Sequence, residues 1–183
     1  MTDNPRRRAV LAGAAALACA GPSWAAPPAW KLDAPNVVAI TPRLTTSGQP
    51  TAAALAGLGA AGFEAVIYLV PGGVSDAVAD EEGIVRRQGL GWAYIPVPFD
   101  SPKEAHFDAF VAALARWPDK RLLVHCQLNL RASSLVLLHR VLVGREDPER
   151  AYDAVAAVWS PSGPWLQLIN SLLRKNGMRF VPY

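Results

Sequence analysis

Short apolar runs of strand length alternate along the chain with longer segments in which apolar residues recur at helical spacing. The apolar runs predict strands at 36–40, 44–47, 63–70, 92–97 and 121–125. Helical spacing predicts helices at 52–61, 80–88, 102–117, 135–143, 148–159 and 164–175. A Pro-Arg turn joins the first two strands, which predicts a hairpin, and the alternation that follows it predicts an α/β fold.

Residues at the predicted helix starts support this division. Thr51 is suited to cap the helix at 52–61, and Ser101 has capping-box spacing before the helix at 102–117. Asp80, Glu81 and Glu82 open the helix at 80–88, where acidic side chains complement the positive end of the helix dipole.

The run at 63–70 is almost continuously apolar, which is typical of a strand buried on both faces of a parallel sheet. We therefore expect one domain at 36–183, preceded by a loose leader at 26–35. Its architecture should be a three-layer sandwich with a mostly parallel central sheet flanked by helices. Ligands bind such sheets at the carboxyl ends of the strands. The strand at 121–125 ends there in His125-Cys126, which makes this the candidate site.

Cys126 is followed by a tight loop, an arginine at Arg131 and a helix. A helix N-terminus presents unpaired N–H groups and the positive end of the dipole, so it favours anions and the thiolate form of a cysteine. We expect the loop, formed by Gln127, Leu128, Asn129, Leu130 and Arg131, to bind an anion beside a nucleophilic thiol.

His-Cys, an arginine and a following Ser or Thr resemble the active-site loop of the cysteine-dependent protein tyrosine and dual-specificity phosphatases. Ile40, Leu44 and Gly48-Gln49-Pro50 further resemble a bacterial branch, the phosphatase-like domain related to beta-lactamase hydrolase-like proteins. The resemblance covers 36–143. It implies hydrolysis of a small phosphorylated or other anionic substrate through a cysteinyl-phosphate, with Cys126 as nucleophile and Arg131 as anion ligand.

The loop departs from the phosphatase pattern in one respect. That pattern has five residues between cysteine and arginine, whereas this chain has four, and Ala132 stands at the usual arginine position. Four intervening residues resemble rhodanese-type sulfurtransferases, which would use a Cys126 persulfide. A catalytically weak anion-binding protein is a third interpretation.

Two interpretations remain open for each of Asp100, Ser133 and Gln49. Asp100 is placed like the family's general acid, but it is equally suited to be a solvated residue before Ser101. Ser133 either supports the leaving thiolate or caps the next helix, and Gln49 either reaches the site or closes its turn. His125 is expected to orient the loop. Asn129 replaces a glycine and tolerates a left-handed backbone better than other side chains do.

Composition argues against several other functions. Residues 1–25 hold three of 18 basic and one of 15 acidic residues, so the rest has a net charge of about +1, which predicts no nucleic-acid surface. His106 and His139 lack metal-ligand spacing, and we expect no metal and no cofactor. The sequence does not indicate an oligomeric state.

The first 25 residues resemble an export signal rather than folded structure. Basic residues precede an alanine-rich apolar run, and Ser23-Trp24-Ala25 fits a signal peptidase site. Arg7-Arg8 resembles the twin-arginine pattern, so we expect a periplasmic protein that starts near Ala26 without stable membrane insertion. Lipidation at Cys19 is the alternative. Cleavage would leave Cys126 as the sole cysteine, so no internal disulfide could form.

Overall fold

The computed structural model describes residues 31–74 and 77–183. The strands are β1 (Val38–Thr41), β2 (Leu44–Ser47), β3 (Ala65–Tyr68), β4 (Gly91–Tyr94) and β5 (Leu122–His125). The helices are α1 (Ala52–Ala56), α2 (Glu81–Arg86), α3 (Glu104–Ala115), α4 (Leu130–Leu142), α5 (Pro148–Ala156) and α6 (Gly163–Lys175). Residues 31–183 form one compact unit.

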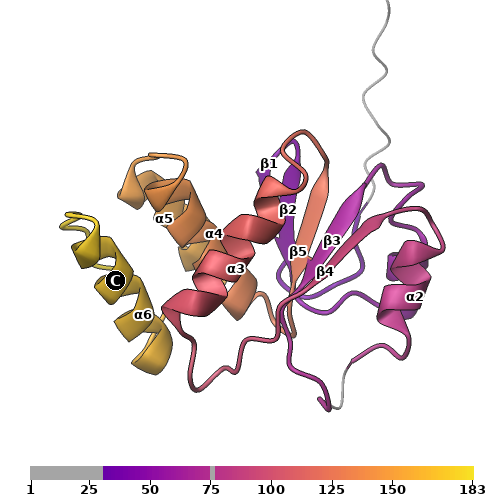
Figure 1. The fold of residues 1–183 in the computed structure, drawn as a ribbon, viewed down its shortest axis with the longest axis horizontal. Helices are drawn as coiled ribbons and strands as arrows, with labels where there is room; N and C mark the ends of the chain where they lie inside the picture. The colour runs from indigo at the N-terminus through magenta and orange to yellow at the C-terminus, as the bar shows by residue number, and fades with distance from the viewer. Residues whose placement is uncertain (1–30, 75–76) are drawn as a thin grey trace, which may run out of the picture. The chain divides into compact units, whose positions relative to one another are not determined.

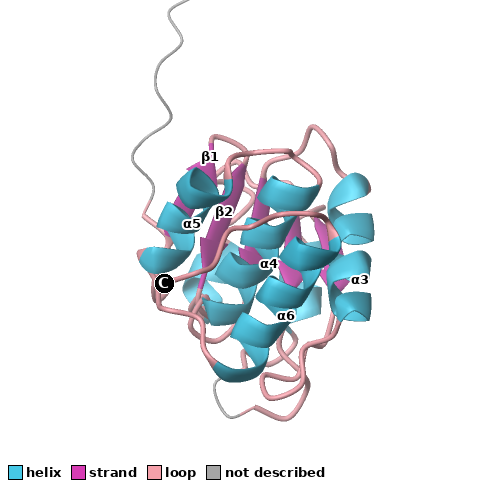
Figure 2. Ribbon diagram, turned by 90° about the vertical axis from the view of Figure 1, so that its left-hand side faces the viewer, coloured by secondary structure: helices cyan, strands magenta, loops and turns pink. Residues whose placement is uncertain are grey.

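The strands make one sheet in the order β1-β2-β5-β3-β4, flanked by helices on both faces. The hairpin of β1 and β2 is antiparallel, and every other neighbouring pair is parallel. Helix α2 lies on one side of the sheet, whereas α3, α4, α5 and α6 cover the other (Figures 1 and 2). The predicted three-layer sandwich with a mostly parallel sheet is confirmed.

The register of the sheet brings the carboxyl ends of four parallel strands to one level. Ser47 of β2 and Tyr68 of β3 both pair with His125 of β5, and Tyr68 also pairs with Tyr94 of β4. The segments that follow these residues must therefore meet at one edge of the sheet. Cys126 follows the central strand of this group.

Burial explains why these segments form strands and helices. All four residues of β3 and of β5 are buried, as expected for central strands covered on both faces. Helix α4 runs between the sheet and the outer helices, and it is buried from Arg131 to Leu138 (Figure 2). Cys126 is therefore held between two of the most deeply buried elements of the fold.

The structure corrects some predicted element ends. Helix α3 begins at Glu104 rather than at 102, and Lys103 is its N-cap. The Ser101 hydroxyl instead donates to the Asp100 carboxylate at 3.1 Å, so the predicted Ser101 cap is wrong. His106 accepts from the Lys103 N–H at 3.0 Å and satisfies one of the orphan donors there. The Thr51 cap is confirmed, because its hydroxyl accepts from the Ala54 N–H.

Part of the predicted loose leader is held by the domain. Leu32 is buried, the Gly48 N–H donates to the Pro35 carbonyl at 2.7 Å, and the Thr51 N–H donates to the Asp33 carbonyl at 3.1 Å. The predicted export segment at 1–25 and residues 26–30 lie outside the described residues. Within the described part of the chain, no helix is long and apolar enough to cross a membrane.

Candidate active site

Cys126 immediately follows β5 and is completely buried, with 0% of its surface exposed. Its N–H donates to the Ser47 carbonyl at 3.2 Å, which continues the pairing of β2 and β5 by one residue. This bond fixes the start of the loop against the strand next to it. The thiol is thus held rigidly in place, but in this conformation it has no exposed surface.

Two asparagines clamp the Cys126 loop against the start of β1. Asn129 is left-handed, with φ 67°, and its amide donates to the Asn36 carbonyl at 2.6 Å and to the Thr46 hydroxyl at 3.0 Å. Asn36 is also left-handed, and its amide donates to the Leu128 carbonyl at 3.0 Å. The expectation that Asn129 lets the loop turn through a left-handed residue is confirmed.

The Gly48-Gln49-Pro50 turn braces the other side of the loop. A Cβ at Gly48 would lie 2.7 Å from the Gln127 carbonyl oxygen and 2.9 Å from Cβ of Pro35, so only glycine fits without displacement. The next residue donates its N–H to the same Gln127 carbonyl at 2.9 Å. The turn therefore has a physical role at the site, which is to let two backbones approach closely.

Helix α4 begins at Leu130, and Asn129 provides no side-chain cap. Its first-turn N–H groups therefore remain without an intrahelical acceptor. Arg131 lies in this first turn and is only 6% exposed, so it is not the surface arginine that a first-turn position alone would suggest. The N-terminus of α4 thus combines N–H groups without an intrahelical acceptor, the positive end of the helix dipole and the Arg131 guanidinium.

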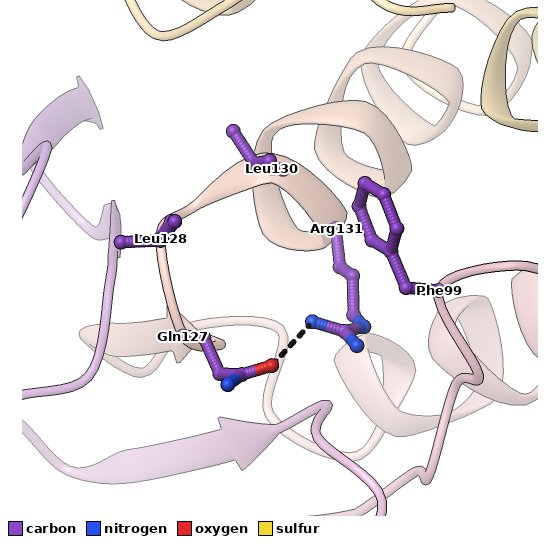
Figure 3. Close-up of a pocket in the computed structure, with 5 residues that line it drawn as sticks. All are labelled: Phe99, Gln127, Leu128, Leu130 and Arg131. Carbon is purple, nitrogen blue, oxygen red and sulfur yellow. Dashed lines mark hydrogen bonds between the residues drawn. The ribbon is translucent and has the colours of Figure 1, made fainter. Parts of the chain in front are cut away.

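Three contacts hold the Arg131 side chain. Its Nε–H donates to the Val97 carbonyl at 2.9 Å, and its Nη1 donates to the Gln127 side-chain oxygen at 3.4 Å. The guanidinium carbon lies 5.1 Å from the centre of the Phe99 ring, a cation–π distance. Figure 3 shows the guanidinium turned toward Gln127, so the loop's own amide occupies one of its donors.

A cavity of about 360 Å³ opens beside this arginine, lined by Phe99, Gln127, Leu128, Leu130 and Arg131 (Figure 3). Three of the five lining residues are apolar, and Phe99 and Leu128 are exposed at its edge. Arg131 is the one charged side chain among the five. The loop residues predicted to bind an anion thus meet an apolar rim contributed partly by the segment after β4.

Several predicted site residues do not line this cavity. Asp100 is exposed and is not among the lining residues, and neither are Cys126, His125 and Gln49, which lie around the loop. Ser133 lies inside α4, where its hydroxyl donates to the Leu130 carbonyl at 3.2 Å, so the interpretation of Ser133 as a helix cap is wrong.

His125 is part of a buried polar network that the sequence did not reveal. Its Nε2 lies 2.7 Å from a carboxylate oxygen of Glu81, the first residue of α2. The other oxygen of Glu81 accepts from the Gln49 amide at 2.9 Å. Glu81 resembles an ordinary acidic residue in a helix first turn, and its partners are distant in sequence, so no local pattern could identify it. The Gln49 side chain reaches Glu81 and its own turn at the Pro50 carbonyl, and it does not line the cavity beside Arg131.

The described residues contain no cluster of three or more His, Cys, Asp or Glu side chains that could hold a metal ion. Burial lowers the pKa of His139, and burial together with the nearby Lys103 charge lowers that of His106. Both histidines belong to helices, His106 to α3 and His139 to α4, and neither contributes to the Cys126 loop.

The sequence has relatives among known proteins, although no protein-family model matches it. It is 35% identical over 116 residues to a beta-lactamase hydrolase-like protein of Xylella fastidiosa (strain Temecula1 / ATCC 700964). It is 32% identical over 113 residues to a protein of the same name from Agrobacterium fabrum (strain C58 / ATCC 33970). Each match covers 60% of this chain and 26% of the relative, so the chain spans about a quarter of these relatives' length.

Solved structures are similar over most of the described residues. A putative phosphatase (DUF442) from Shewanella putrefaciens CN-32 is 29% identical with a TM-score of 0.71, and the match covers 78% of this chain and 93% of that one. Tk-PTP in its active form is 21% identical with a TM-score of 0.62, over 80% of this chain and 99% of that one.

The chain has a fold similar to that of protein tyrosine phosphatase-like proteins, with its cysteine loop directly after β5. It is similar in particular to a DUF442 putative phosphatase and to beta-lactamase hydrolase-like proteins, which confirms the resemblance predicted from Gly48-Gln49-Pro50 and the Cys126 loop. These relatives give no support to the sulfurtransferase interpretation.

Proposed function

We propose that the chain hydrolyses phosphate monoesters through a cysteinyl-phosphate on Cys126. The observation that supports this most is the Cys126–Arg131 loop, which joins β5 to the uncapped N-terminus of α4 in a phosphatase-like fold. The Cys126 thiolate attacks phosphorus while the ester oxygen leaves and takes a proton from a general acid, for which Asp100 is the candidate. Water then attacks phosphorus and breaks the sulfur–phosphorus bond, which releases inorganic phosphate, regenerates the thiolate and returns a proton to the general acid.

Binding of the phosphate requires a rearrangement of the Arg131 contacts. The Gln127 side-chain oxygen occupies one donor of Arg131, and the Val97 carbonyl occupies another. A dianionic phosphate is a stronger acceptor than a neutral amide, so it replaces the Gln127 contact and gains the first-turn N–H groups of α4. Because Cys126 is completely buried, the thiol must also become accessible before it can attack phosphorus.

The cavity favours an ester with one phosphate on an apolar group. Its rim of Phe99, Leu128 and Leu130 is suited to an aryl group, whereas Arg131 alone supplies positive charge among the lining residues. A substrate with several phosphates would need further cations. We therefore propose an aryl monophosphate, such as the side chain of phosphotyrosine, rather than a polyphosphorylated substrate.

One paired assay tests the proposal. The full chain, Cys126→Ser and the matched control Cys19→Ser are compared in hydrolysis of phenyl phosphate and in sulfur transfer from thiosulfate to cyanide. The proposal expects hydrolysis by the wild type and by Cys19→Ser and none by Cys126→Ser. Sulfur transfer without hydrolysis would overturn it.

A second candidate function is anion binding without turnover. It is favoured by the complete burial of Cys126 and by the internal contacts of Arg131. Under this alternative the wild type binds inorganic phosphate, as measured by calorimetry, but releases no phenol from phenyl phosphate. Arg131→Lys, which keeps the charge and loses the planar fork, would weaken that binding.

We also propose export by the twin-arginine route, on the basis of Arg7-Arg8 and the apolar run after them. Expression of the full chain in a Gram-negative host, followed by fractionation, should place a shortened product in the periplasm. Replacing Arg7 and Arg8 together by lysine should retain it in the cytoplasm, whereas Arg6→Lys should not. If the unmodified chain stays at full length in the cytoplasm, the export proposal is wrong.

A further inference from the structure

Glu81 is a buried carboxylate that the proposed reaction does not use. It is 5% exposed, whereas the side chain of Glu82, the next residue of the same helix, is 55% exposed and pairs with Arg86. Glu81 instead points inward to His125 at 2.7 Å. That distance is an ion-pair distance, although the N–H is not aligned for a hydrogen bond, so we treat the contact as electrostatic.

The burial of Glu81 requires polar partners. Moving a carboxylate out of water is costly unless a charge or several hydrogen bonds compensate it. The described contacts of Glu81 are the amide of Gln49 and the imidazole of His125. The imidazole is in turn stacked on the Tyr68 ring, with ring centres 5.0 Å apart, so Glu81 and Tyr68 together fix its position.

Glu81 also connects to the Cys126 loop by a second route. Gln49 donates its side-chain amide to Glu81 and its backbone N–H to the Gln127 carbonyl. His125, the other partner of Glu81, is bonded covalently to Cys126. Glu81 therefore holds the loop on both sides of the cysteine, through His125 before it and through Gln49 at the residue after it.

We propose that Glu81 is a positioning residue that holds His125, and through it the adjoining Cys126, in the place from which the thiol reacts. This inference rests on the proposed function. Adjacent residues at a strand end point to opposite sides, so His125 acts on Cys126 through the backbone that they share and not by a proton transfer. No bond is made or broken by Glu81.

The test compares Glu81→Gln with Glu82→Gln, a matched loss of one carboxylate from the same helix. Hydrolysis of phenyl phosphate gives kcat and KM. Alkylation of Cys126 by iodoacetamide at neutral pH, followed by mass spectrometry of its peptide, reports the reactivity of the thiol without any substrate and separates Cys126 from Cys19. Thermal unfolding reports the fold.

For Glu81→Gln we expect kcat to fall roughly tenfold or more while KM stays within about twofold, and alkylation of Cys126 to slow in parallel. Glu82→Gln should change neither, and Glu81→Asp should recover part of the loss. If Glu81→Gln alkylates Cys126 and turns over substrate within about twofold of the wild type, the proposal is wrong.

A double-variant comparison shows whether Glu81 acts through His125. In a His125→Gln background, Glu81→Gln should slow the alkylation clearly less than it does in the wild-type background, because the contact with His125 is already lost and only the contact with Gln49 remains. An undiminished effect in that background would contradict the mechanism. Glu81→Asp, which keeps the carboxylate on a shorter side chain, replaces Glu81→Gln in this comparison where Glu81→Gln fails to fold.

The two proposals fail in distinguishable ways. A wild type that alkylates Cys126 faster than Glu81→Gln but hydrolyses no phosphate ester supports the role of Glu81 and refutes the proposed reaction. Hydrolysis that requires Cys126 and is unaffected by Glu81→Gln refutes only the role of Glu81.

Discussion

At the scale of single residues, the Cys126 loop depends on backbone positions that accept few side chains. Gly48 is needed because two backbones meet there, and Asn129 is needed because the chain turns through a left-handed conformation and must also be held to Asn36. These two residues contribute no reacting group. They fix the position of the loop that carries Cys126.

Gly48→Ala tests the close approach at the loop. Its Cβ would meet the Gln127 carbonyl oxygen at 2.7 Å, and a backbone oxygen cannot move without moving the loop. We expect the free energy of unfolding to fall by about 1–3 kcal/mol, measured by urea denaturation, with a loss of kcat.

Gly72→Ala is the matched control for this change, because the nearest atom to its Cβ would be the Tyr94 hydroxyl at 3.9 Å. It should alter stability by no more than about 0.5 kcal/mol. Equal stabilities for the two alanine variants would show that the loop does not need a glycine at 48.

The sequence could predict those residues of the site whose role is local. Cys126, Asn129 and Arg131 follow one another along the chain, and their order predicted the loop, its left-handed turn and the helix after it. Glu81 could not be predicted, because its meaning depends on His125, 44 residues later in the chain (125 − 81). The inward direction of Arg131 likewise depends on Val97 and Phe99 from the segment after β4.

At the scale of elements, the segment between β4 and α3 contributes Val97 and Phe99 to the site and leaves Asp100 outside it. If Asp100 protonates the leaving oxygen, this segment must turn toward the cavity when substrate binds. Ser101 and Pro102, near the end of this segment, are not helical, and α3 begins only at Glu104.

Asp100→Asn tests that movement. A general acid matters most for a poor leaving group, so we expect kcat to fall by roughly a hundredfold with phenyl phosphate and by much less with p-nitrophenyl phosphate. Asp108→Asn, an exposed carboxylate of α3, is the control and should change neither. Equal and small effects on the two substrates would remove Asp100 from the mechanism.

Packing between helices also makes stability depend on pH. His139 of α4 packs edge-on against Phe110 of α3, and burial lowers its pKa below the ordinary value of 6.5. The unfolded chain then binds more protons than the folded one below about pH 6.5, so stability present above that pH is lost as pH falls toward the folded pKa.

We expect the free energy of unfolding to decrease between about pH 7 and about pH 5.5, and His139→Gln to show a smaller decrease. Urea denaturation at both pH values measures it. His106, whose pKa is also lowered, accounts for part of the remaining slope. An unchanged slope in His139→Gln would show that His139 titrates alike in the folded and unfolded chains.

At the scale of the whole molecule, the fold could be predicted further than the site. Buried apolar runs and helical periodicity identified each strand and helix of residues 31–74 and 77–183, because burial on a sheet or on one helix face leaves a local pattern. The first and last residues of the helices were less predictable. The α3 start differs because Ser101 bonds to Asp100, and α1 ends at Ala56 although its apolar pattern continues.

The C-terminal residues complete the outer layer of helices. Phe180 packs against Tyr152 of α5 with ring centres 5.5 Å apart, and the Tyr152 hydroxyl donates to the Tyr183 carbonyl. The C-terminal tail is therefore docked on α5. It stabilises α5 and α6, which cover α4, and so supports the helix that presents Arg131.

The central claim, that Cys126 becomes phosphorylated during turnover, is tested most directly by trapping that intermediate. The full chain is mixed with p-nitrophenyl phosphate, quenched within the first turnover and digested, and the peptide that contains Cys126 is weighed by mass spectrometry. The account predicts the added mass of one phosphoryl group on that peptide, accompanied by a burst of nitrophenol, and neither in Cys126→Ser. Steady hydrolysis by the wild type with an unmodified Cys126 throughout would contradict it.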